Sequence, residues 1–405
     1  MFKNHLLQSK AFSMFLILFF CGSLFLPGTK VASAEEVFPE VDAGASVLIE
    51  FSREEIIFAQ NESEPLPPAS LTKIMTLLIA YEALRDGKVT PEEEVVIGEE
   101  AWATGGSQMF LEIDQRVSFE KLITGIASIS ANDACVAIAE HLYGSEAAFV
   151  QEMNNKAREL GLQNTHFQNT TGLPDPEHYA SAEDIGRLAH YLIQNFPEAL
   201  EQHSLKEFTS NDILQYNRNP LLGRYEGADG LKTGHTSAAG YCLAGTAYRD
   251  GMRFITVVMN AESDQDRLRD STALLNHAFQ NYTLEKIYSA GNKPTTIEVL
   301  RGDLREIDLL LKDAVEVVIP DNHKENLEVY FEIPENITAP IEKETEIGSV
   351  KVMLEDENLL ESPLVASENV ERAGTFSLIF RSLGDFFTGI WNGISQFLQD
   401  LVDRE

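Results

Sequence analysis

Two strand-like regions separated by a long helical region place the strongest constraint on the fold of this 405-residue chain. Residues 41–60 follow the pattern of two strands joined through "SREE", and strand-like segments return only from about residue 229. In between, apolar side chains recur at helical spacing over about 70–85, 118–142, 145–160 and 181–194. We therefore expect a sheet built from distant parts of the chain, with a block of helices between them.

The later strands and the remaining C-terminal half show two more changes of pattern. "YCLAGTAY" and "MRFITVVMN" read as strands joined at the turn "RDG", and a helix over about 264–281 follows them. From about 291 to 372 the sequence holds short β runs separated by Gly, Pro, Asn and Asp: "TTIEVL", "EIDLLL", "AVEVVIP", "LEVYFEIP" and "GSVKVML". This spacing predicts a small all-β domain.

The last stretch, residues 376–402, predicts an amphipathic helix. Its apolar side chains, many of them aromatic, recur at steps of three and four, whereas Arg381, Asp385, Asn392 and Gln396 interrupt every apolar run long enough to span a bilayer. We expect the helix to lie flat on a membrane surface, where its polar face stays in water. Docking of the same helix onto the β domain is the alternative.

The N-terminus has the features of a secretory signal peptide. Lys3, His5 and Lys10 precede the apolar run "AFSMFLILFFCGSLFL", and "ASA" at 32–34 is a small-x-small cleavage site. We expect an exported protein that begins near Glu35 and faces the outer side of the cytoplasmic membrane. An uncleaved membrane anchor is the alternative.

The charge balance excludes nucleic acid as an expected partner. The chain carries 31 basic and 64 acidic residues, a net charge of −33, which becomes −36 when the three lysines of the signal peptide are removed. Such a chain repels nucleic acid and anionic headgroups. After cleavage only Cys135 and Cys242 remain, and their apolar surroundings predict buried free thiols rather than a disulfide framework.

The segment "PPASLTKIMT" contains a candidate nucleophile and base. Ser70 and Lys73 are three residues apart at the start of a helical pattern, so both side chains point to the same side. A helix cap and a solvated lysine would look the same. The chain contains a second S-x-x-K match at Ser118, which we interpret as the N-cap of the next helix.

Two further motifs favour the catalytic interpretation of Ser70. "SAN" places Ser130 and Asn132 two residues apart after a helical run, and "KTG" places Lys232, Thr233 and Gly234 just before a strand. S-x-N also occurs as "SEN" at 367–369, but K-T-G occurs once. S-x-x-K, S-x-N and K-T-G in this order form the motif set of the serine penicillin-recognising enzymes.

The chain resembles the D-alanyl-D-alanine carboxypeptidases, which are low-molecular-mass penicillin-binding proteins. The resemblance covers most of residues 41–280, through "VDAGASVLIE", "PPASLTKIMT", "SISANDACVAIAEHLYGS", "MNNKARELGL", "TGLPDPEHYASAEDIGRLA", "GLKTGHTSAAGYCL" and "LLNHAF". It implies an α/β fold of the β-lactamase/transpeptidase type: an antiparallel sheet with helices on both faces and a helical subdomain. The implied organisation is a signal peptide (1–34), a penicillin-binding peptidase domain (35–285), a small all-β domain (286–372) and the amphipathic segment (373–405).

The resemblance also implies roles for the motif residues. Ser70 would be the nucleophile, Lys73 its base, Ser130 a proton relay to the leaving amine and Asn132 a ligand of the substrate amide. A nearby cation would lower the pKa of Lys73, and Lys232 is a candidate for it. The oxyanion hole would use the backbone N–H groups of Ser70 and His235. Thr233 and the strand after it would bind the peptide by edge pairing, with Gly234 allowing a close approach of the backbone.

The substrate implied by the resemblance is a peptidoglycan stem peptide with a free D-alanine carboxylate, and β-lactams would acylate the same serine. Arg267 and Arg218 match arginines of the family pattern and are candidate partners of that carboxylate. No cofactor or metal is expected, because the histidines form no H-E-x-x-H or comparable ligand pair. His178 and His235 are better interpreted as residues that line the site.

Two alternatives share the motifs. A class A β-lactamase would need a deacylating glutamate, and the nearest candidate, Glu159, reads instead as the end of a helix. Such an enzyme also has S-D-N where this chain has "SAN", and it does not need a β domain or an anchor. A non-catalytic cell-wall binding protein of the same fold would not need all three motifs intact.

Overall fold

The computed structural model describes residues 37–374, which divide into two compact units, residues 37–283 and 284–374. The predicted signal peptide and the predicted amphipathic helix both lie outside the described residues. Within residues 37–374, no helix combines the length and apolar character needed to cross a membrane.

The first unit is built on a five-stranded antiparallel sheet with the strand order β2-β1-β9-β8-β7. Its strands are β1 (Ala45–Glu50), β2 (Glu55–Gln60), β7 (Ala228–Thr236), β8 (Gly240–Arg249) and β9 (Met252–Ala261). The pairing of β1 with β9 joins the two ends of this unit's sequence, which confirms the expected sheet of distant segments. Strand β7 lies at the edge of the sheet, so one side of its backbone is open to pairing.

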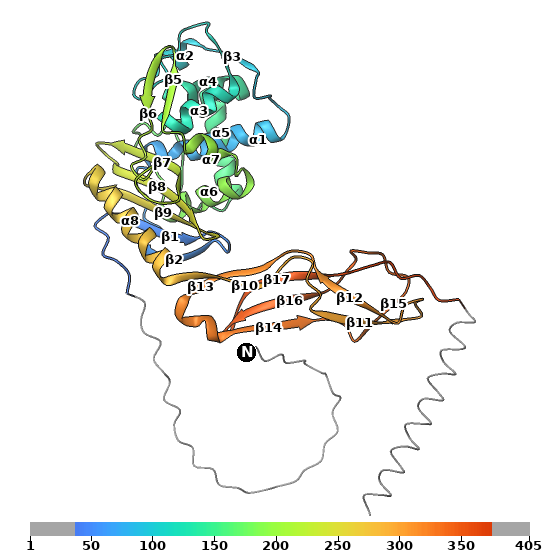
Figure 1. Ribbon diagram of the computed structural model, residues 1–405. Helices are drawn as coiled ribbons and strands as arrows, with labels where there is room; N and C mark the ends of the chain where they lie inside the picture. Colours follow the sequence, from blue (N-terminus) through green and yellow to red (C-terminus); the bar gives the residue numbers. More distant parts are fainter. Residues whose placement is uncertain (1–36, 375–405) are drawn as a thin grey trace, which may run out of the picture. The chain divides into compact units, whose positions relative to one another are not determined.

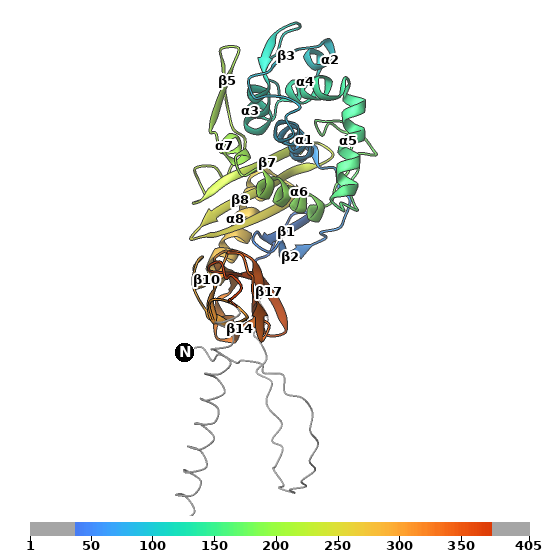
Figure 2. The ribbon, with the colours of Figure 1, turned by 90° about the vertical axis from the view of Figure 1, so that its right-hand side faces the viewer.

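Helices cover both faces of this sheet. Figures 1 and 2 show α6 and α8 on opposite faces of the sheet. The other helices form a block beyond the sheet edge that β7 provides. The helices are α1 (Lys73–Arg85), α2 (Glu99–Ala103), α3 (Phe119–Ile129), α4 (Asn132–Tyr143), α5 (Glu146–Glu159), α6 (Ala182–Asn195), α7 (Ala199–His203) and α8 (Asp264–Asn281). Nearly all of α1 is buried at the centre of this helical block. Two short antiparallel pairs complete the unit: β3 (Glu94–Val96) with β4 (Arg116–Ser118), which are separated in sequence by α2, and the hairpin of β5 (Glu207–Ser210) with β6 (Ile213–Tyr216).

Three local predictions need correction. The helical pattern over 118–142 forms two helices, because Ser130 takes a left-handed backbone (φ 65°) that ends α3. The K-T-G residues lie inside strand β7 rather than before a strand. Ser70 lies in a 3₁₀ turn, η1 (Ala69–Thr72), that leads into α1.

The second unit is an all-β structure apart from one 3₁₀ turn, η2 (Asp321–Asn326), which confirms the predicted β domain. Its six-stranded sheet has the order β14-β16-β17-β12-β11-β15, and β10 pairs separately with β13. The strands are β10 (Tyr282–Tyr288), β11 (Thr295–Leu300), β12 (Glu306–Leu311), β13 (Val315–Pro320), β14 (Leu327–Glu332), β15 (Asn336–Thr338), β16 (Glu346–Leu354) and β17 (Glu357–Ala366). Its core is aliphatic, with Leu309, Val350 and Leu364 fully buried.

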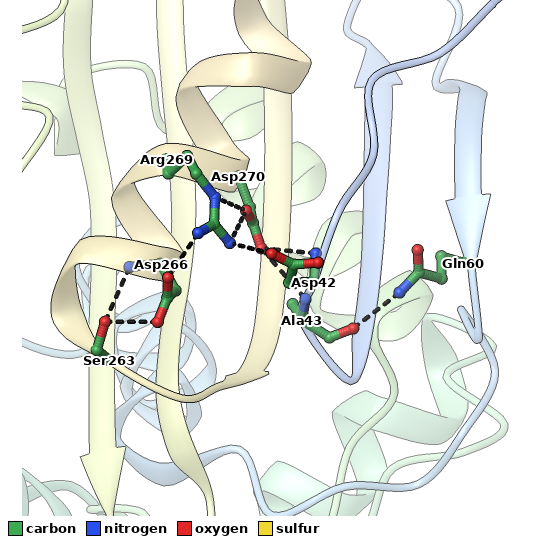
Figure 3. A network of polar contacts seen from close by, with 7 residues as sticks. All are labelled: Asp42, Ala43, Gln60, Ser263, Asp266, Arg269 and Asp270. Atoms are coloured by element: carbon green, nitrogen blue, oxygen red, sulfur yellow. Dashed lines mark hydrogen bonds and ion pairs between the residues drawn. The ribbon is translucent and has the colours of Figure 1, made fainter.

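A polar network fastens the start of the first unit to helix α8 (Figure 3). The carboxylate of Asp270 is fully buried and accepts the backbone N–H groups of Asp42 and Ala43, each at 3.2 Å. Arg269 bonds to Asp270 at 2.9 Å and to Asp42 at 2.8 Å, so its guanidinium joins the segment and the helix. The network therefore anchors the segment that precedes β1 to helix α8.

We expect Asp270→Ala to destabilise the first unit by about 2 kcal/mol, because two backbone N–H groups, that of Ala43 buried and that of Asp42 partly buried, lose their acceptor. For a unit of this size, the thermal midpoint should fall by roughly 4–8 °C in calorimetry. Asp42→Ala is the matched control: its carboxylate is 66% exposed and takes part in a surface ion pair, so it should cost less than about 1 kcal/mol. Equal shifts in both variants would contradict this explanation.

Candidate active site

The predicted pair of Ser70 and Lys73 is in direct contact. The Lys73 Nζ donates a hydrogen bond to Ser70 Oγ at 2.9 Å and another to the carbonyl of Thr171 at 2.6 Å. Lys73 is fully buried, whereas Ser70 is partly exposed. A substrate can therefore reach the hydroxyl while the amine beneath it stays shielded from water.

Two glycines allow the sharp turn that presents Ser70. Ala69, just before it, has a left-handed backbone (φ 48°), a conformation that non-glycine residues rarely adopt. A Cβ on Gly172 (φ 82°) would lie 1.8 Å from the Ala69 carbonyl oxygen, and a Cβ on Gly234 would lie 3.1 Å from the Ser70 backbone nitrogen. Both positions therefore require glycine, and β7 passes directly beside the Ser70 N–H.

Burial sets the electrostatics of the two lysines. It lowers the pKa of Lys73 to about 8, with a further contribution from the positive charge of Arg218. The pKa of Lys232 also falls well below its usual range, first because of burial and then because of Lys73. Burial raises the pKa of the neighbouring Cys135 thiol to about 12, so that thiol remains neutral. A neutral amine beside Ser70 is thus accessible near neutral pH.

The S-x-N motif occupies the junction between α3 and α4. The Ser130 Oγ is buried and has no hydrogen-bond partner within residues 37–374. The Asn132 Nδ2 donates to the Gly105 carbonyl at 2.7 Å, and its backbone N–H donates to the Ser107 carbonyl at 2.7 Å. The loop around Gly105 thus fixes Asn132, while the Ser130 hydroxyl remains available.

The K-T-G motif and His235 lie along the edge strand β7. Lys232 and Thr233 are buried, and the Lys232 Nζ donates to the Thr233 carbonyl at 3.0 Å. His235 is exposed, and its ring packs against Tyr241 with a centroid distance of 4.1 Å. All four residues therefore lie on the strand that borders Ser70.

The two arginines approach from different sides. Arg267, on α8, is buried and donates to the carbonyls of Gly234 at 3.1 Å and Cys242 at 2.9 Å. Arg218 is exposed and donates to Ser107 Oγ at 2.7 Å. Arg267 thus supports the strand from behind, whereas Arg218 lies over the loop that holds Asn132.

Two residues of the site, Thr171 and Ser107, could not be found from the sequence. The Thr171 carbonyl holds Lys73 and the Ser107 carbonyl holds the Asn132 N–H, and a backbone carbonyl leaves no signal in the sequence. The "TTGLPDPEH" stretch offered one signal, a glycine among prolines.

His178 from this stretch accepts the Gln168 N–H at its Nδ1 (3.2 Å), so its Nε2–H donates to Thr72 Oγ1 at 2.8 Å. Burial lowers the pKa of His178 to about 4. A cavity of about 430 Å³, lined in part by Pro68, His178 and Thr236, opens beside it.

The remaining assignments are structural. Ser118 caps α3 by accepting the Lys121 N–H, as predicted. Glu159 ends α5 and pairs with Lys156 at 2.9 Å. Cys135 and Cys242 are free and buried. Across residues 37–374, no group of three or more His, Cys, Asp or Glu side chains is arranged to hold a metal ion.

Comparison with known families gives two matches. A model described as D-alanyl-D-alanine carboxypeptidase matches residues 30–263, and one described as penicillin-binding protein 5, C-terminal domain, matches residues 282–372. D-alanyl-D-alanine carboxypeptidase DacF of Bacillus subtilis is 37% identical over 351 residues, which cover 85% of this chain and 90% of the relative. DacC of Escherichia coli is 36% identical over 365 residues, covering 88% and 91%.

Solved structures give the same result. Penicillin-binding protein 5 from Haemophilus influenzae superposes with a TM-score of 0.71 at 35% identity, covering 83% of this chain and 99% of that one. Penicillin-binding protein D2 from Listeria monocytogenes, in its ampicillin-bound form, gives 0.55 at 31% identity, covering 60% and 98%. These matches extend over both described units for the first structure and over a smaller part for the second.

Proposed function

The chain belongs to the D-alanyl-D-alanine carboxypeptidase family, and from this membership we propose how its own residues release a terminal D-alanine. It is a serine-type D-Ala-D-Ala carboxypeptidase and a penicillin-binding protein with a transpeptidase-like α/β domain and an all-β C-terminal domain. The family implies peptidoglycan peptides as substrates and binding of β-lactams. The observation that carries the proposal is the 2.9 Å contact between the buried Lys73 amine and Ser70.

Acylation begins at Ser70. The neutral Lys73 amine accepts the hydroxyl proton while Ser70 Oγ attacks the carbonyl carbon of the penultimate D-alanine. The N–H groups of Ser70 and His235 donate to the oxyanion that forms. The C–N bond then breaks, Ser130 relays the proton that Lys73 took from Ser70 to the departing amine of D-alanine, and an ester on Ser70 remains. Water hydrolyses this ester and restores the hydroxyl.

The peptide binds as an added strand on β7. An antiparallel arrangement brings its C-terminal carboxylate toward Lys232 and Arg218, because the chain then runs from His235 toward the start of β7. Asn132 orients the peptide amide, and Thr233 and Gly234 belong to the strand with which the peptide pairs. Arg267, whose guanidinium is paired with Asp264, lies behind this strand as the second candidate partner of the carboxylate.

We expect Arg218→Ala to lower kcat/KM for peptides with a free C-terminal carboxylate by roughly tenfold, and to leave amide-capped peptides nearly unchanged, when both are compared on the high-pH plateau where Lys73 is neutral in either protein. Arg267→Ala should lower both, because two strand carbonyls lose their donor, and should lower the free acids more. Steady-state kinetics on matched acid and amide peptides measure this difference. Equal losses on the two peptides would remove that arginine from carboxylate recognition.

A direct test of the function follows peptidoglycan fragments incubated with the purified protein by mass spectrometry. Pentapeptide stems should each lose one alanine residue, and fluorescent penicillin should label the protein covalently. A class A β-lactamase would hydrolyse penicillin rapidly without shortening the stems. A non-catalytic wall-binding protein would do neither.

The proposed location is the outer face of the cytoplasmic membrane, where residues 376–402 would hold the exported protein. With few cations on the polar face of this segment, attachment should depend on apolar burial. We expect the protein to resist salt washes, to be released by detergent, and to become soluble when residues 376–405 are deleted, with activity on small peptides retained. Sedimentation of the truncated protein with membranes would contradict this anchor.

A further inference from the structure

The edge of strand β7 is closed just before Lys232. His203, the last residue of α7, donates its Nδ1–H to the Leu231 carbonyl at 2.7 Å, and Asn219 donates its Nδ2–H to the Gly230 carbonyl at 2.7 Å. His203 is fully buried and Asn219 is 6% exposed. Two successive carbonyls of the strand are therefore held by side chains from outside the sheet.

A third side chain joins these two into a closed circuit. The Asn217 Nδ2 donates to the carbonyls of His203 at 3.0 Å and Leu205 at 2.8 Å, and its Oδ1 accepts the Asn219 N–H at 2.9 Å. The end of α7 and the turn around Asn219 thus form one structure, which we call the edge clamp (His203, Asn217 and Asn219). Contacts within the protein alone hold these three side chains in place.

The direction of the Leu231 carbonyl shows which backbone groups a peptide can use. Strand β8 occupies one edge of β7, so a bond from α7 places the Leu231 carbonyl on the other edge. Backbone groups alternate in direction with a period of two, which puts Thr233 and His235 on that same open edge. A peptide strand can therefore pair along Thr233 and His235 but meets the clamp at Leu231.

We propose that the edge clamp restricts this enzyme to the last peptide bond of its substrate. The inference rests on the proposed antiparallel binding of the peptide to β7. One residue beyond the scissile bond reaches Lys232 and Arg218, and its carboxylate ends there. A longer chain has to displace the fully buried His203 from the Leu231 carbonyl, and the displaced side chain loses its acceptor. His203 is a specificity-determining residue, and Asn217 and Asn219 position it; none of the three touches the reacting atoms.

Burial also keeps this selectivity independent of pH. It lowers the pKa of His203 to about 3, so the ring is neutral and retains its Nδ1–H throughout the working range. Changes in pH that alter the protonation of Lys73 therefore leave the clamp intact.

The test compares two peptides that differ at one end: diacetyl-L-lysyl-D-alanyl-D-alanine and the same peptide extended by one glycine. The readouts are release of D-alanine from the first and of D-alanyl-glycine from the second. The wild-type protein should prefer the unextended peptide by at least about 100-fold in kcat/KM. In His203→Ala this preference should fall at least tenfold, whereas His203→Gln, which keeps an amide donor, should retain it at every pH from 6 to 9.

Acylation by penicillin reports whether each variant is folded, because the ring carboxylate of penicillin takes the place of the terminal D-alanine and nothing extends beyond it. A His203→Ala protein that is labelled at the wild-type rate and keeps the wild-type preference would overturn the proposal. A preference lost equally in His203→Gln would overturn it as well. If His203→Ala does not fold, Asn219→Ala has to show the same loss of preference. Failure of the wild-type protein to release D-alanine from the unextended peptide would instead overturn the proposed function.

Discussion

Replacing Ser70 with alanine is expected to reduce kcat/KM for D-alanine release by roughly 10⁴-fold or more, and to abolish covalent labelling by penicillin. The variant loses the hydroxyl to which Lys73 donates its hydrogen bond, so no ester can form at this position. The turn itself should persist, because its geometry depends on Ala69, Gly172 and Gly234. Release of D-alanine and gel fluorescence with labelled penicillin measure the two effects.

Ser118→Ala is the matched control, because Ser118 begins the other S-x-x-K sequence early in the chain. Its hydroxyl caps α3 and contacts the Lys121 N–H at 3.4 Å, so its removal should cost about 1 kcal/mol of stability and no activity. Labelling that survives in Ser70→Ala and disappears in Ser118→Ala would reverse the assignment.

The second large effect is expected at Lys73. Lys73→Met keeps the length of the side chain but removes the base, and acylation should slow by roughly 10²–10⁴-fold. Stopped-flow measurement of penicillin acylation gives this rate directly. An unchanged rate would place the base elsewhere, and Lys232 would be the next candidate.

The pH profile tests the same role. Because the pKa of Lys73 is lowered to about 8, the amine is protonated below that pH and cannot accept the proton of Ser70. The acylation rate should therefore rise about tenfold per pH unit below 8 and level off above it. In Arg218→Ala the pKa of Lys73 should move upward, since Arg218 helps to lower it, and the profile should shift to higher pH. A flat profile between pH 6 and 9 would contradict the assignment.

The architecture was predictable wherever the apolar spacing was regular over the full length of a helix or strand. The β1–β2 hairpin, helix α6 and helix α8 follow clear apolar spacing, and five of the β runs after residue 291 form strands. Strand β17 was missed because Pro363 and the polar residues around it interrupt the strand pattern in the sequence. In the structure Pro363 is part of the strand and pairs with Ser349. The short helix α7 has too few residues to establish a periodicity.

The candidate site was predictable where side chains carry the chemistry, and less so where the backbone does. The left-handed Ser130 interrupts a continuous helical pattern, because the tertiary structure overrides the local preference there. The Thr171 carbonyl that holds Lys73 could come from any residue type. Arg218 matched the family pattern, but its contribution to the pKa of Lys73 depends on the fold of the turn between β6 and β7.

The measurement that tests the central claim most directly is the location of the acyl group. The protein is incubated with penicillin, denatured, digested and mapped by tandem mass spectrometry. We expect the penicilloyl mass on the peptide that contains Ser70, and its complete absence from that peptide in Ser70→Ala. An acyl group on Ser118 or Ser130, or a wild-type protein that carries none, would contradict the account.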